Sequence, residues 1–195
     1  PMLDTPELVY DYLLDYLGQP GVTLPAGLQF GLKLGGFAKG VTARAIGNRI
    51  TALAANFIAG TDLESALPKL EDLWNAGIAA SIDLLGEACV SREEAEAYQR
   101  RYLEVIERLA ERAKEWPPDR RLESDHLGPV PRANVSIKVS SLSARVDPID
   151  FEGSIRNLQE ALRPILTAAA GRGVMVNFDM EQYALKDLTI ALFQR

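Results

Sequence analysis

Hydrophobic positions recur at helical spacing through the first part of the chain. The segments with this spacing cover residues 5–18, 41–60 and 61–77. A Ser/Thr-x-x-Glu capping box is expected at the start of the last of them, with Thr61 and Glu64 as its two members. We therefore predict an N-terminal helical arm with lead-in helices over residues 1–77.

From residue 78 onward, short apolar runs alternate with long amphipathic segments. The runs are predicted to be buried strands, because they are short, apolar and bounded by turn residues. The expected strands cover residues 78–86, 134–142 and 174–180, and the expected helices cover residues 91–116, 151–171 and 181–195. Strands that are apolar on both faces and joined by crossover helices are typical of a parallel sheet.

Three β/α units in succession fit either a doubly wound sheet or part of a (β/α)₈ barrel. A complete barrel needs about 250 residues, whereas residues 78–195 hold three of the eight units. We expect an α/β fold in which residues 78–195 form the first part of a TIM-like (β/α)₈ barrel, truncated, in a chain that continues beyond Arg195.

Each predicted strand ends in charged residues. Asp83 and Glu87 lie at or just past the carboxyl end of the first strand, Lys138 at that of the second, and Asp179 and Glu181 at that of the third. In parallel α/β folds the carboxyl ends of the strands form the rim at which ligands bind. The pattern predicts one shared site, in which the lysine either holds an anion or only neutralises the acids in a structural ion-pair ring.

Charge and rare residues narrow the classes of partner. The net charge of −6 disfavours a nucleic-acid partner, because phosphates are neutralised by clustered Lys and Arg. A single cysteine, Cys89, forms no internal disulfide, and a single histidine, His126, supports no multi-histidine zinc site. The sequence has no apolar run of about 18 residues and starts with acidic residues, so we expect a cytoplasmic protein.

Three motifs resemble the proline dehydrogenase domain, most closely that of the bifunctional bacterial proline utilization A flavoenzymes. Residues 82–88 are IDLLGEA, residues 136–140 are SIKVS and residues 177–181 are NFDME. They stand in the order and at the spacing of the family, and the resemblance runs from about residue 38 to the end of the chain.

This resemblance implies an FAD-dependent oxidation of L-proline to Δ1-pyrroline-5-carboxylate on a distorted (β/α)₈ barrel. Lys138 matches the lysine that binds the substrate carboxylate, with Asp83 orienting it. Asp179, with the backbone of Met180 beside it, matches the acid next to the flavin. Glu87 matches the acid that pairs with an arginine and closes over the substrate.

The resemblance also implies partners and missing parts. The electron acceptor would be a quinone, reached by a peripheral contact at the inner face of the membrane. An NAD-dependent pyrroline-5-carboxylate dehydrogenase would be fused to the enzyme or act as its partner. The family's arginine pair, tyrosine lid and most flavin contacts belong to later strands, so we expect the isolated 195-residue chain to be inactive and not to bind FAD stoichiometrically.

Two other functions remain open from the residues themselves. A Schiff-base lyase or aldolase on the same barrel would use Lys138 as nucleophile and Asp83 or Asp179 as proton shuttle. A non-catalytic helical interaction module would instead use the first 77 residues. The charges at the strand ends have no role in that second alternative.

Overall fold

The computed structural model describes residues 5–17, 19, 39–86 and 89–195. The chain divides into two compact units, residues 1–60 and residues 61–195. In the first unit, helix α1 (Pro6–Leu17) contacts helix α3 (Lys39–Ala54). Both helices lie in segments where the hydrophobic spacing predicts them.

The second unit has a mixed α/β fold, as predicted. Its elements in chain order are α4 (Leu63–Asn75), β1 (Ile82–Asp83), α5 (Arg92–Ala113), β2 (Ser124–Asp125), β3 (Gly128–Pro129), β4 (Asn134–Lys138), α6 (Phe151–Arg172), β5 (Met175–Asp179) and α7 (Lys186–Gln194). Short 3₁₀ turns follow β4 at Val139–Ser141 and precede α7 at Tyr183–Leu185. The first strand is much shorter than the predicted range of residues 78–86.

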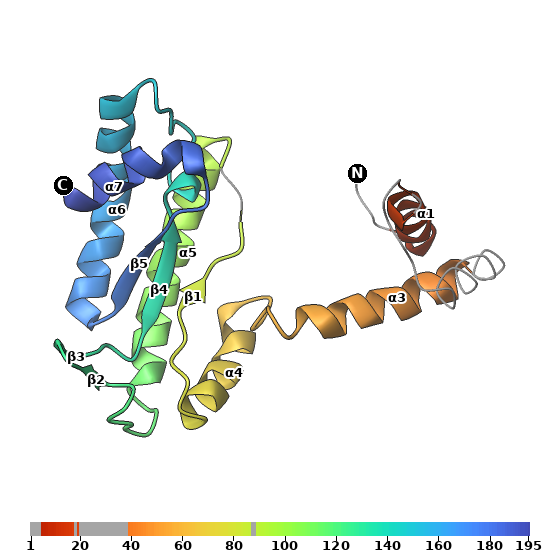
Figure 1. Cartoon of the computed structure of the whole chain (residues 1–195), viewed down its shortest axis with the longest axis horizontal. Coiled ribbons are helices and arrows are strands. Elements are labelled where there is room, and N and C mark those ends of the chain that lie inside the picture. Colours follow the sequence, from red (N-terminus) through yellow and green to blue (C-terminus); the bar gives the residue numbers. More distant parts are fainter. Residues whose placement is uncertain (1–4, 18, 20–38, 87–88) are drawn as a thin grey trace. The chain divides into compact units, whose positions relative to one another are not determined.

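Strands β1, β4 and β5 form a parallel sheet in the order β1-β4-β5. Helix α5 connects the first pair and α6 the second, which confirms the predicted β-α-β-α-β succession. Both helices lie against the sheet in Figure 1, and they contact each other as well as the strands. The register pairs Asp83 with Ser136 and Lys138 with Asp179, so the strands end close to one another.

The two faces of the sheet differ in polarity. The face toward α5 and α6 carries apolar residues that belong to the core: Ile82, Val135, Ile137, Val176 and Phe178. The opposite face carries polar ones: Asp83, Asn134, Ser136, Lys138, Asn177 and Asp179. The prediction of strands that are apolar on both faces is therefore wrong.

Hydrogen bonds explain why polar residues are tolerated on that face. Asn177 Nδ2 donates to Ser136 Oγ at 3.2 Å, and Ser81 Oγ donates to Asn134 Oδ1 at 2.8 Å. Ser136 is buried, with 7% of its surface exposed, and a buried hydroxyl needs such a partner. Short polar side chains can thus fill positions of the strand that would otherwise be apolar.

Side-chain caps fix where the helices begin. Ser91 caps α5 by accepting the N–H of Glu94 at 3.1 Å. Helix α4 is capped by Asp62, which accepts the N–H of Ser65 at 2.8 Å while Ser65 Oγ accepts the N–H of Asp62 at 3.3 Å. The predicted box at residues 61 and 64 is wrong, because this aspartate and serine form the reciprocal pair one residue later.

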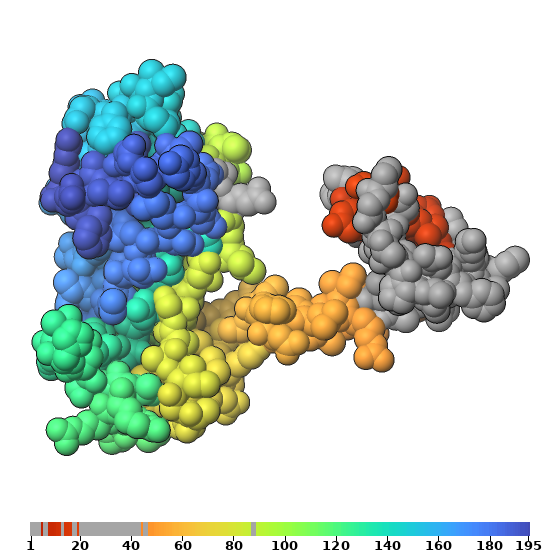
Figure 2. Space-filling view, in the orientation of Figure 1, coloured from red at the N-terminus to blue at the C-terminus, as the bar shows by residue number. Residues whose placement is uncertain are grey.

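Helix α4 packs on α5, through apolar residues of both helices that belong to one core. The compact unit therefore begins at Thr61, whereas the sequence pattern predicts the start of the barrel at residue 78. The hairpin β2–β3, with exposed His126 in its turn, lies at the end of this unit opposite α7 (Figures 1 and 2). Among the described residues, no helix is long and apolar enough to cross a membrane.

The two faces of the sheet predict that replacing a side chain by alanine destabilises the protein more on the apolar face than on the polar one. Ile137 has no exposed surface, whereas Met175 on the polar face is 46% exposed. We expect Ile137→Ala to lower the free energy of unfolding by about 2–5 kcal/mol, from lost burial and the cavity left behind. Met175→Ala should change it by about 0.5 kcal/mol or less. Urea denaturation of both variants checks this, and equal losses would contradict the assignment of the faces.

Candidate active site

Lys138 is the last residue of β4, and its side chain is only 5% exposed. The ammonium group donates to both carboxylate oxygens of Asp83, at 2.6 Å and 2.5 Å, and lies 3.4 Å from the carbonyl oxygen of Leu84. An ammonium has three N–H donors, so the first strand and the residue after it occupy all of them.

Two more acids face the same ammonium from the third strand. Glu181 Oε1 lies 3.6 Å from Lys138 Nζ, and Asp179 Oδ2 lies 4.0 Å from it. The structure thus brings together the predicted residues Asp83, Lys138 and Asp179. Three carboxylates around one ammonium leave a local charge of about −2 when all are ionised.

Glu181 is one of the predicted strand-end charges, but the resemblance gives it no role in the site. It lies closer to the ammonium than Asp179 does. Glu181 lies two residues past the end of β5 and outside the strand. Its place among the charges that follow the strand was therefore the feature that could have assigned the glutamate to the site.

The surroundings of Lys138 raise its pKa above the ordinary value of 10.5. Burial is the largest single influence and lowers the pKa, but it is outweighed by the hydrogen bond and charge of Asp83 together with the charge of Glu181. The ammonium is therefore protonated at neutral pH. Because the folded pKa is raised, the stability that this group contributes is present below pH 10.5 and is lost as the pH rises through the folded value.

Of the other two predicted site residues, the structure describes Met180 but not Glu87. Met180 is 45% exposed and lines a small depression together with Val139, Asp179 and Glu181. Glu87 lies outside the described residues, so its predicted contact with an arginine stays a prediction. Just before it, a Cβ at Gly86 would lie 1.7 Å from the hydroxyl oxygen of Tyr98, which explains the glycine at this position of the motif.

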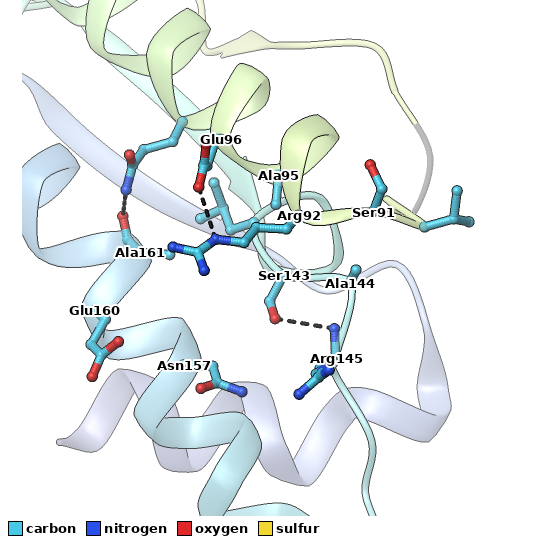
Figure 3. Close-up of a pocket in the computed structure, with 13 residues that line it drawn as sticks. Ser91, Arg92, Ala95, Glu96, Ser143, Ala144, Arg145, Asn157, Glu160 and Ala161 are labelled. Atoms are coloured by element: carbon cyan, nitrogen blue, oxygen red, sulfur yellow. Dashed lines mark hydrogen bonds and ion pairs between the residues drawn. The ribbon is translucent and has the colours of Figure 1, made fainter.

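A larger pocket of about 730 Å³ lies between α5 and α6 (Figure 3). None of the acids around Lys138 lines it. Its Arg92 is paired with Glu96 at 2.9 Å, and Gln99 donates to the Ala161 carbonyl at 2.8 Å. Because the charges at the strand ends lie outside this pocket, we assign the candidate site to the strand ends instead.

Cys89 lies near the strand ends but is a poor nucleophile. The residue is buried, and its thiol donates to the Ser140 carbonyl at 3.6 Å. Burial raises the pKa of Cys89, which disfavours the reactive thiolate. Within the described ranges, no group of three His, Cys, Asp or Glu side chains is arranged to hold a metal ion.

The distances predict how strongly each acid raises the pKa of Lys138. Asp83→Asn should lower the pKa of Lys138 most, Glu181→Gln less and Asp179→Asn least, because the carboxylates lie progressively farther from Nζ. The measurement is an NMR titration of ¹³C-labelled lysine Cε, with the Lys138 resonance assigned by its absence in Lys138→Arg. Asp179→Asn lowering the pKa as much as Asp83→Asn would contradict this geometry.

The strands and the charged residues at their ends lie in a segment that is similar to known proteins. The family model described as proline dehydrogenase matches residues 66–195. Proline dehydrogenase 1 of Bacillus subtilis subsp. natto is 28% identical over 153 residues, which are 78% of this chain and 42% of that protein. Bifunctional protein PutA of Escherichia coli is 22% identical over 143 residues, 73% of this chain and 10% of PutA. The chain thus spans less than half the length of these curated relatives.

Solved structures agree. Proline utilization A from Bdellovibrio bacteriovorus, inactivated by N-propargylglycine, superposes with a TM-score of 0.76 at 35% sequence identity, over 79% of this chain and 16% of that chain. Proline utilization A from Bradyrhizobium japonicum covers 96% of this chain and 18% of its own, with a TM-score of 0.59 at 19% identity, which supports the fold alone. Since the family model matches most of the chain, including β1, β4 and β5 with their charged ends, the chain belongs to the proline dehydrogenase family.

Proposed function

We propose that this chain supplies the substrate-carboxylate side of a proline dehydrogenase site, for the FAD-dependent oxidation of L-proline to Δ1-pyrroline-5-carboxylate. The observation that carries the proposal is the buried, protonated Lys138 at the carboxyl end of β4. A compact ammonium is a point charge suited to a small carboxylate. Membership of the proline dehydrogenase family supports the choice of substrate.

We further propose that the three strands belong to a (β/α)₈ barrel whose interior is the polar face of the sheet. The crossover helices on the other face and the parallel order β1-β4-β5 support this. In this arrangement the charged strand ends lie at the carboxyl-terminal mouth of the barrel, where barrel enzymes bind their substrates.

In the proposed site, Lys138 binds the carboxylate of proline while Asp83 keeps the ammonium in place. The lysine hydrogen bond that gives way most easily is the longest of the three, which joins Nζ to the Leu84 carbonyl at 3.4 Å. One ammonium does not balance three carboxylates and the carboxylate of the substrate, so cations from other parts of the enzyme must complete the site. The resemblance assigns this role to an arginine pair and an arginine opposite Glu87.

The residues at the end of β5 fit a flavin edge. Asp179 is 36% exposed at its side chain, and no hydrogen bond to a described residue occupies its carboxylate beyond the ion pair with Lys138. With the backbone of the partly exposed Met180, this carboxylate would hold FAD, which supplies the hydride acceptor when bound. The chain's own residues bind and orient proline and keep its carboxylate at a fixed position.

The partners proposed for the whole enzyme follow from the resemblance, and the relative from Escherichia coli is itself named as bifunctional. They are a quinone that accepts the electrons at the inner face of the membrane, and a fused or separate NAD-dependent pyrroline-5-carboxylate dehydrogenase. A cytoplasmic location agrees with both.

Removal of the Lys138 ammonium should weaken proline binding specifically. In the natural protein that contains these residues, we expect Lys138→Ala to raise the KM for L-proline about 10- to 100-fold, the effect of losing one buried charge-assisted hydrogen bond. The flavin content should stay intact, because the residues proposed to hold FAD are unchanged. Dye-coupled proline oxidation and flavin absorbance measure the two quantities.

Lys114→Ala is the matched control, since Lys114 is an exposed lysine at the end of α5, and it should leave both quantities unchanged. Unchanged proline kinetics in Lys138→Ala would remove Lys138 from the site. Borohydride trapping of a substrate carbonyl on Lys138 would instead support the Schiff-base lyase or aldolase, which the raised pKa of Lys138 disfavours.

A further inference from the structure

Two buried hydroxyls hold the main chain of Lys138. The backbone N–H of Lys138 donates to Tyr102 Oη at 3.2 Å, and Ser141 Oγ donates to the Lys138 carbonyl at 2.7 Å. Tyr102 comes from the middle of α5 and has no exposed surface, and Ser141 is 1% exposed. Neither contact involves the lysine side chain. Both instead fix the position of the backbone from which that side chain extends.

The backbone of Lys138 needs such partners because β1 does not extend far enough to pair with it. Strand β1 ends at Asp83, whose partner in β4 is Ser136, two residues before Lys138. On the other side, the pairing of Lys138 with Asp179 is the last of the ladder. After Lys138 the chain turns into the 3₁₀ turn Val139–Ser141. The lysine is therefore at a strand end that has lost its β1 neighbour, where backbone groups need other partners.

We propose that Tyr102 is a positioning residue for Lys138: its hydroxyl fixes the backbone at the end of β4, so that the ammonium meets Asp83 and the carboxylate of the substrate. The substrate part of this inference rests on the proposed function. The positioning part rests on the hydrogen bond between the two residues.

The chemistry of Tyr102 favours this role over packing alone. Its ring belongs to the apolar core between α5 and the sheet, and a phenylalanine would fill that space without a buried polar atom. Burial raises the pKa of Tyr102, while the hydrogen bonds with the Lys138 backbone and the Ser141 side chain lower it to a smaller extent. The phenol therefore remains neutral at physiological pH, and its oxygen is available as an acceptor.

The test is Tyr102→Phe in the natural protein that contains these residues, because this change keeps the ring and removes the hydroxyl. The probe is acetic anhydride, with the acetylation rate of each lysine measured by peptide mass spectrometry. Ser154→Ala is the matched control: Ser154 is 1% exposed and accepts the N–H of Asp147 at 2.9 Å at the start of α6. It removes a buried hydroxyl that does not contact Lys138.

We expect Tyr102→Phe to speed acetylation of Lys138 about fivefold, the population change that one lost hydrogen bond produces, with the other lysines unchanged. The KM for L-proline should rise by a similar factor while kcat changes less than about twofold, because the residue acts through binding. Ser154→Ala should leave Lys138 acetylation and the KM as they are.

Lys138 acetylation that is unchanged in Tyr102→Phe, or that rises equally in Ser154→Ala, would overturn the inference. If Tyr102→Phe fails to fold, Ser141→Ala replaces it, since it removes the other hydrogen bond to the Lys138 backbone, and the same outcomes apply. A wild-type protein that does not oxidise proline, combined with faster Lys138 acetylation in Tyr102→Phe, would overturn the proposed function and leave the positioning role supported.

Discussion

The ion pair between Lys138 and Asp83 is the interaction on which the candidate site depends. A charge with 5% exposure at its side chain is costly to bury unless an opposite charge and hydrogen bonds compensate it. Asp83 supplies both with its two oxygens, and it can do so because β1 and β4 are parallel neighbours that end close together. The fold thus determines the site through the positions where two strands end.

The sheet has one apolar and one polar face because the helices cover only one of them. Helices α5 and α6 bury one face, so the strands need apolar residues only at alternate positions. The other positions are free for Ser136, Asn177 and the charged ends, which pair with each other across the strands. A polar face of this kind suits the interior of a small barrel with a binding site at its mouth.

The sequence predicted the parallel β-α-β-α-β succession and the meeting of Asp83, Lys138 and Asp179, because strand-end position and parallel topology together bring such residues to one edge. It did not predict the polar face, since short serine and asparagine side chains within a valine- and isoleucine-rich run resemble a buried strand. It also did not predict the contact of Tyr102 with Lys138. Helical spacing indicates that a tyrosine faces the core, but not which backbone group its hydroxyl meets.

The excess of acids at the strand ends raises the central question, which is whether Lys138 binds an anion or only neutralises its neighbours. The most direct measurement is a crystal structure of the natural protein containing these residues with a carboxylate analogue of proline bound. If Lys138 binds the substrate, a carboxylate oxygen of the analogue will lie about 3 Å from Lys138 Nζ, with the contact to Asp83 retained. An analogue bound with its carboxylate away from Lys138, whose ammonium still contacts only acids, would contradict it.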